Sequence, residues 1–166
     1  PLALDDGPRL AAFYESVPRE DYRFYCPHPL TRQNAFRNAA AADSPFEVVL
    51  VMETEGGAIG GYAWFRWKEG ASRSMFGICI QRGFQGGGAG HALMARLFEI
   101  ARGIGPPIMA LTVQKANARA VALYRKMGFK PVREQMRGEQ GGFPPELEYY
   151  MEMACLLYTS PSPRDS

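Results

Sequence analysis

Residues 78–94 read I-C-I-Q-R-G-F-Q-G-G-G-A-G-H-A-L-M, and the rest of the chain is organised around them. A short β-type run (78–80) leads into a glycine-dense turn (85–90), which opens directly into a helical pattern. The first-turn N–H groups of a helix lack partners within the helix, and the helix dipole is positive at that end. Because glycines let an anion approach the backbone closely, the stretch predicts a phosphate-binding turn.

Two common phosphate-binding motifs do not fit this turn. A P-loop requires Lys followed by Ser or Thr after its last glycine, whereas Gly90 is followed by His91. The dinucleotide pattern G-x-G-x-x-G also fails, because its last position falls on His91 when counted from Gly86 and on Leu93 when counted from Gly88. The sequence therefore does not indicate a nucleotide or dinucleotide ligand.

The glycine turn contains the motif Q-x-x-G-x-G at residues 85–90. A second motif, N-x-x-A-x-x-L-Y-x-x-x-G-F, occupies residues 117–129. This pair, in this order and after a strand, resembles the pyrophosphate loop and the following helix of the GCN5-related N-acetyltransferase (GNAT) superfamily. The resemblance covers residues 8–154. It implies acetyl-CoA as the cosubstrate and direct transfer of its acetyl group to a primary amine, on a small molecule or a peptide.

The resemblance also implies roles for individual residues. The backbone of the turn would hold the CoA pyrophosphate, through Gln85, Gly86, Gly87, Gly88, Ala89 and Gly90. The edge of the preceding strand would bind the pantetheine arm, through Ile78, Cys79 and Ile80. Asn117 would contact the CoA arm, and Tyr124 would be the general acid that protonates the departing thiolate. A backbone N–H near Ile80 would stabilise the oxyanion.

Each of these roles has a simpler alternative. Tyr124 can be a core aromatic residue, Asn117 is a good helix N-cap in any case, and Cys79 has the setting of a small buried apolar residue. The three consecutive glycines depart from the family pattern, which often has a polar residue at Gly87. Either CoA would then bind more weakly, or Arg82 and His91 would supply the missing charge.

The acceptor side carries no recognisable motif. No carboxylate on the strand at 72–80 offers a general base. Two loops, 19–30 and 138–145, would border the acceptor, and His28 is either a base or a residue that shapes its loop. Further pocket candidates, each equally compatible with a surface position, are Tyr22, Arg23, Tyr25, Arg137 and Glu139.

Apolar periodicity and turn residues predict one α/β domain. Helices are expected at 8–17, 31–42, 89–104 and 117–127, with Phe36 on the buried side of the second. Strands are expected at 46–53, 58–67, 72–80, 108–113, 129–137 and 146–154. The predicted fold is a mixed, mostly antiparallel sheet of about six strands flanked by about four helices, the GNAT fold. Residues 1–6 are expected to be the remnant of a strand that begins earlier.

The composition is that of an ordinary globular domain. The chain has 166 residues, 46% of them hydrophobic, and a net charge of +2, which favours neither nucleic acid nor a membrane surface as a partner. No stretch is long and apolar enough to span a bilayer. Three cysteines without metal-ligand spacing are typical of a reduced, cytoplasmic protein. We expect a monomer or a homodimer.

The last twelve residues differ sharply from what precedes them. The stretch C-L-L-Y-T-S-P-S-P-R-D resembles a translated sequencing adapter, so we expect residues 1–154 to form the GNAT domain and residues 155–166 to be a non-native tail. The rival to an enzyme is a non-catalytic acyl-CoA-binding or regulatory module cut from a larger protein. Tyr124 favours the enzyme, because binding alone does not require a general acid.

Overall fold

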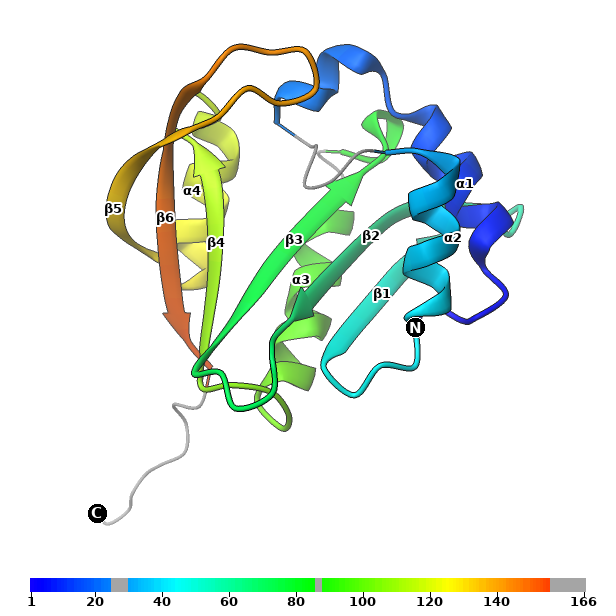
Figure 1. Ribbon diagram of the computed structural model, residues 1–166, viewed down its shortest axis with the longest axis horizontal. Coiled ribbons are helices and arrows are strands. Elements are labelled where there is room, and N and C mark those ends of the chain that lie inside the picture. Colours follow the sequence, from blue (N-terminus) through cyan, green and yellow to red (C-terminus); the bar gives the residue numbers. More distant parts are fainter. Residues whose placement is uncertain (25–29, 86–87, 156–166) are drawn as a thin grey trace.

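The computed structural model describes residues 1–24, 30–85 and 88–155 (Figure 1). Within them, six strands form a single sheet in the order β1-β2-β3-β4-β6-β5. The elements in chain order are α1 (Gly7–Ser16), the 3₁₀ turn η1 (Arg19–Arg23), α2 (Arg32–Ala40), β1 (Glu47–Glu53), β2 (Ile59–Arg66), β3 (Arg73–Ile80), the 3₁₀ turn η2 (Arg82–Phe84), α3 (Ala89–Ala101), β4 (Ile108–Gln114), α4 (Ala118–Met127), β5 (Lys130–Arg137) and β6 (Glu146–Ala154). The predicted mixed sheet with four helices is confirmed.

The sheet opens between its two central strands. Among the strands of the described residues, β3 and β4 are the only parallel neighbours, and they pair at only three positions, residues 73–75 with residues 108–110. Beyond these positions β3 stays paired to β2 as far as Ile80, and β4 stays paired to β6 as far as Gln114. Figure 1 shows the two strands diverging from their lower ends upward. The divergence leaves one edge of β3 exposed inside the sheet.

Helices cover the two faces of the sheet unequally. On the back face, α3 and α4 bury a core that includes Leu97, Phe98, Leu111, Phe129 and Met151. On the front face, α1 and α2 pack on β2 and β3 through a second cluster, which includes Leu10, Phe13, Tyr14, Tyr62 and Cys79. Helices α1 and α2 lie over only the β1–β3 half of the sheet (Figure 1). No helix among the described residues covers the front of β4, β6 and β5.

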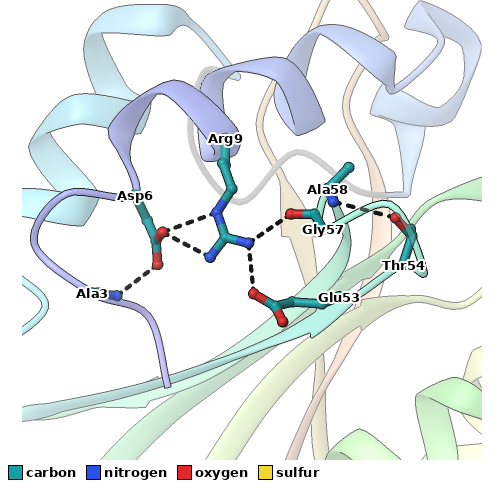
Figure 2. Close-up of polar contacts among 7 residues, drawn as sticks. All are labelled: Ala3, Asp6, Arg9, Glu53, Thr54, Gly57 and Ala58. Atoms are coloured by element: carbon teal, nitrogen blue, oxygen red, sulfur yellow. Dashed lines mark hydrogen bonds and ion pairs between the residues drawn. The ribbon is translucent and has the colours of Figure 1, made fainter.

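A polar network fixes the start of α1 to the end of β1 (Figure 2). The Asp6 carboxylate accepts hydrogen bonds from the Ala3 N–H and from the Arg9 guanidinium. Arg9 also donates to Glu53 at 2.6 Å and to the Gly57 carbonyl oxygen at 2.7 Å. One side chain therefore joins the covering helix to the β1–β2 turn.

Two details of the predicted helices were wrong. Phe36 is 41% exposed, because α2 meets α1 through Ala35 and Ala39, which are buried. The Phe36 ring instead lies over Gly7, where an added Cβ would come within 2.4 Å of it. The helix expected to reach residue 104 ends at Ala101, and Ile104 is exposed.

The start of the chain lies beside β1 without forming a strand of its own. Residues 1–6 are not a strand in the structure, although the Leu2 N–H donates to the Val49 carbonyl of β1 at 3.0 Å. The Thr31 side chain caps α2 as expected, by accepting from the Asn34 N–H. Among the described residues, no helix combines the length and apolarity needed to cross a bilayer.

Candidate functional site

The exposed edge of β3 is set by strand alternation. The Gln81 N–H donates to Gly60 on β2, so in this antiparallel ladder residues 77 and 79 also face β2, whereas Ile78 and Ile80 face the opening. The Ile80 carbonyl accepts from the Gln85 side chain at 2.9 Å. Ile78 therefore offers its backbone to the opening, as does the N–H of Ile80. Cys79 faces β2 with its backbone, and its side chain is 1% exposed within the front cluster.

The N-terminus of α3 lies just beyond this edge and has no side-chain cap. By contrast, α2 and α4 are capped by Thr31 and Asn117. The residue that precedes α3, Gly88, has φ = +87°, a conformation that favours glycine, and open space surrounds the position of its missing Cβ. Helix α3 thus presents uncapped N–H groups of its first turn at an open position, as an anion site requires.

The predicted turn residues take two kinds of role here. Ala89 and Gly90 form the first turn of α3, and the Gln85 side chain ties the turn to the end of β3. Gly86 and Gly87 lie outside the described residues. Arg82, a candidate for extra charge, is held by Asp21 in an ion pair, with Glu20 nearby.

A cleft of about 770 Å³ occupies the opening between β3 and β4. Its walls come from both faces of the sheet: Phe76, Ile78, Asn117 and Tyr124 toward the back, and Trp64, Met75, Gly77, Thr112, Gln114 and Glu148 toward the front. The Trp64 ring lies directly against Gly77, where an added Cβ would be only 2.1 Å from the indole. The cleft therefore connects the edge of β3 with the uncovered front face.

Tyr124 and Asn117, the two predicted residues of the second motif, both line this cleft. Tyr124 is 9% exposed, and its ring packs edge-on against Phe76 and Phe129 at centroid distances of 6.2 and 6.0 Å. Asn117 accepts from the Ala120 N–H through Oδ1, at 3.4 Å, as the N-cap of α4. Gly128, with φ = +115°, ends the helix. The cap leaves the Asn117 amide N–H groups available to a ligand.

The front wall contains a buried carboxylate that the sequence did not single out. Glu148 on β6 is 7% exposed, and its Oε2 accepts from Gln135 Nε2 on β5 at 2.7 Å. Gln114 on β4 pairs with Glu148 in register and donates to the Arg23 carbonyl. The position of Glu148 on the front face could have been predicted from the alternation of E-L-E-Y-Y along β6, which puts residues 146, 148 and 150 on one face.

Arg137 lies beside this carboxylate and is only partly paired. Its Nη1 donates to the Arg23 carbonyl at 2.8 Å and its Nε to the Gly138 carbonyl at 3.3 Å. Its Nη2 is buried, lies 3.7 Å from Glu146 Oε1, and makes no hydrogen bond within the described residues. Arg23 takes both oxygens of Glu146, at 2.9 and 3.0 Å, and this hydrogen bonding lowers the pKa of Glu146.

The remaining acceptor-side candidates are not gathered at the cleft. Glu139 is exposed and does not line it, and Arg23 borders it through its carbonyl contacts. Tyr25, His28 and the side chain of Tyr22 lie outside the described residues. Nowhere in the described residues do three or more His, Cys, Asp or Glu side chains gather as metal ligands would.

Comparisons with known proteins agree with this geometry. Residues 10–129 match the sequence model of the Acetyltransferase (GNAT) family. The chain is 35% identical over 83 residues to mycothiol acetyltransferase of Beutenbergia cavernae, an alignment that covers 50% of this chain and 28% of that protein. The chain thus spans little more than a quarter of that curated relative.

Solved structures align over nearly the whole chain. A GNAT-family acetyltransferase from Streptococcus pneumoniae superposes with a TM-score of 0.75 at 25% identity, over 92% of this chain and 95% of that one. A putative acetyltransferase from Salmonella typhimurium, solved with its cofactor acetyl-CoA, gives 0.74 at 22% identity, over 95% of each chain. At 22% identity, the similarity to the Salmonella typhimurium protein shows a shared fold.

Proposed function

Because this chain belongs to the acetyltransferase (GNAT) family, we propose that it transfers the acetyl group of acetyl-CoA to a primary amine bound in the cleft between β3 and β4. Family membership confirms the predicted superfamily, the enzyme class and acetyl-CoA as the cosubstrate. The observation that carries the proposal is the early end of β3–β4 pairing, which gives a cleft that joins an exposed strand edge to the front face. The amine acceptor and the residue roles are the proposed part.

The residues present fit the cosubstrate. The uncapped first turn of α3, with Gly88 before it, would take the pyrophosphate, and Gln85 would hold that turn against β3. The backbone groups of Ile78 and Ile80 would form hydrogen bonds with the amides of the pantetheine arm. The arm would thus pair with the edge of β3 as an additional strand would. The Asn117 amide N–H groups would donate to the same arm. Because Cys79 faces β2, we give it no contact of its own.

The chemistry asks little of side chains. Acetyl-CoA supplies a thioester carbonyl that is ready for attack by a neutral amine. A backbone N–H of Ile78 or Ile80 would stabilise the negative charge that develops on the carbonyl oxygen, so this step requires no charged side chain. Tyr124 would donate its phenolic proton to the sulfur as the C–S bond breaks, since a phenol with a reference pKa of about 10 is protonated at neutral pH.

The proposal is tested by Tyr124→Phe, which removes the acid and keeps the ring that packs on Phe76. We expect kcat to fall by roughly 10²- to 10⁴-fold on a panel of amines, measured as release of free thiol, because this is the usual contribution of a positioned acid. CoA affinity, measured by calorimetry, should stay within a factor of two or three of wild type. Tyr149→Phe, on the back face outside the cleft, is the matched control and should keep wild-type kcat.

The rival function, a non-catalytic acyl-CoA-binding module, predicts a different pattern. Under it the wild-type chain binds CoA but acetylates no amine on the panel, and Tyr124→Phe changes nothing. An unchanged kcat in Tyr124→Phe, with an active wild type, would instead refute the acid role alone. Wild type without CoA affinity would refute both functions. A cytoplasmic location and a monomeric or homodimeric state stay predictions.

A further inference from the structure

Glu148 is a buried carboxylate that has no cationic partner among the described residues. It is 7% exposed and receives one hydrogen bond, from Gln135. None of the ion pairs in the described part of the chain involves it. Burying a carboxylate is unfavourable unless a positive group or several hydrogen-bond donors compensate it. Since Glu148 lines the cleft, an entering ammonium group would supply that compensation.

Arg137 is the complementary group. It lines the same cleft with a side chain that is 10% exposed, and its Nη2 makes no hydrogen bond within the described residues. Nη2 of Arg137 makes no hydrogen bond with Glu146 because Arg23, from η1, already donates to both oxygens of that carboxylate. Arg137 therefore stays 3.7 Å from Glu146. Arg137 therefore keeps positive charge and an unused donor next to the cleft.

The sheet register places these two groups side by side. Glu148 pairs with Gln135, and Glu146 pairs with Arg137, so Glu148 and Arg137 are diagonal neighbours on the front face of β5 and β6. Diagonal neighbours of this kind lie about 7–8 Å apart, within reach of long side chains. An α-amino acid carries its ammonium and carboxylate on one carbon, and it can span such a pair with one group toward each residue.

We propose that the acceptor is a primary amine that also carries a carboxylate, of the α-amino acid type. Its ammonium lies at Glu148 and its carboxylate at Arg137. This inference rests on the proposed function and names the substrate class for the same site. It also gives the proton acceptor that the sequence did not provide, because Glu148 is the single carboxylate among the described residues that line the cleft.

The protons balance in this arrangement. Glu148 takes one proton from the bound ammonium, which frees the nitrogen lone pair. The C–N bond then forms as the carbonyl carbon is attacked, and the C–S bond breaks while Tyr124 gives its proton to sulfur. The nitrogen loses two protons in all: one replaces the proton that Tyr124 gave to the CoA thiol, and the other is released to solvent.

The rest of the cleft lining disfavours a polycationic acceptor. Besides Arg137, the described part of the lining contains three basic residues: Arg66, Lys68 and Arg73. Arg66 and Arg73 pair with Glu47 and Glu152, which do not line the cleft, and Lys68 is exposed at its rim. A polyamine would bring several positive charges against these four residues with one carboxylate to receive them.

The test uses matched acceptors: α-amino acids, their carboxamides, their decarboxylated amines, and spermidine. We expect wild type to prefer each free acid over its amide by roughly 10- to 100-fold in kcat/KM, the size of one charge-assisted hydrogen bond. Arg137→Met should abolish this preference by raising KM for the acids alone. Glu148→Gln should lower kcat/KM for all acceptors, with partial recovery at high pH, where the free amine is abundant.

Arg133→Met is the matched control, since Arg133 lies on the same strand face over the Tyr150 ring and does not line the cleft. It should keep the preference for acids, and all three variants should bind CoA as wild type does. Equal use of acids and amides, better use of spermidine, or an unchanged preference in Arg137→Met would overturn the inference while the acetyltransferase function stands. CoA binding without acetylation of any amine would refute the proposed function itself.

Discussion

The front face of the sheet has two halves of opposite character. The covered half, β1 to β3, lies under α1 and α2 and buries aromatic side chains, with Phe13 edge-on to Tyr62 at 5.6 Å and Tyr62 stacked on Trp64 at 5.0 Å. In the open half, β4, β6 and β5, no helix of the described residues covers the strands (Figure 1). This half carries charged and amide side chains instead, among them Glu152, whose ion-pair partner Arg73 comes from the neighbouring end of β3.

Polar groups are treated differently in the two halves. In the covered half, burial raises the pKa of the Tyr14 and Tyr62 hydroxyls, which keeps both neutral, and Tyr14 accepts from Asn38. In the open half, Glu152 accepts hydrogen bonds from Tyr150 on the same strand and from Arg73 at the start of β3, and these hydrogen bonds lower the pKa of Glu152, so it stays charged. One half thus contributes stability through burial, and the other keeps charges at the border of the cleft.

The comparison teaches where a site can form on a continuous sheet. The back core runs under both halves, joining residues of β2, β3, β4 and β6 to α3 and α4, so the open half does not need a front helix to be held in place. The cleft lies where the two halves separate, with the aromatic Trp64 on one side and Glu148 on the other. Substitutions in each half should therefore have separable effects on stability and activity.

The largest expected effect is a loss of stability in the covered half. Phe13→Ala removes a ring that is 2% exposed, and we expect it to lower the free energy of unfolding by about 3–5 kcal/mol. Arg73→Met removes the β3 partner of Glu152, a residue of the open half; the arginine of this ion pair is 49% exposed, so the loss should be about 1 kcal/mol or less. Urea unfolding of the two variants measures this difference. Similar losses would show that both halves are equally important for folding.

A smaller effect is expected at the boundary of the cleft. Asn117→Ala removes the cap of α4 and should lower the free energy of unfolding by about 1 kcal/mol. In the proposed site it should also weaken CoA binding by roughly 10-fold, the value of one lost hydrogen bond. Thr31→Ala removes the equivalent cap of α2, away from the cleft, so it should cost the same stability and leave CoA affinity unchanged. Equal CoA affinity in the two variants would leave Asn117 with the cap role alone.

Local signals explain which parts of the fold were predictable. Asn117 and Gly128 bracket α4, and the turns around Gly57 and Gly70 separate the strands, because caps and positive-φ glycines act on their own few residues. Phe36 was misplaced because its exposure depends on α1, a separate segment. Helical periodicity marks an apolar face but does not say that alanines make the close contact and a phenylalanine lies at its margin.

The residues proposed for the donor side could be named from the sequence more readily than those proposed for the acceptor side. The turn at 85–90 and the helix at 117–129 are contiguous motifs, whereas the acceptor wall is assembled by register across β4, β6 and β5. Glu146 and Glu148 are two residues apart and share a face, yet Arg23, 123 positions earlier, pairs with the first and leaves the second for the cleft. No local pattern distinguishes two such glutamates.

The smallest expected effect concerns how α1 is held on the covered half (Figure 2). Burial alone would raise the pKa of Asp6, but hydrogen bonds from Ala3 and Arg9 outweigh it and lower the pKa. A carboxyl group whose pKa is lower in the folded state stabilises the fold above the unfolded pKa of about 3.9 and loses that effect as pH falls through the folded value. Asp6→Asn should therefore destabilise the domain at pH 7, by less than either cap variant, and the gap to wild type should shrink below about pH 4. Urea midpoints from pH 7 to pH 3 measure it, with Glu69→Gln in the β2–β3 turn as the control. A gap that persists at pH 3 would mean that Asp6 acts through its shape and neutral hydrogen bonds, and that its charge does not fasten α1 to the sheet.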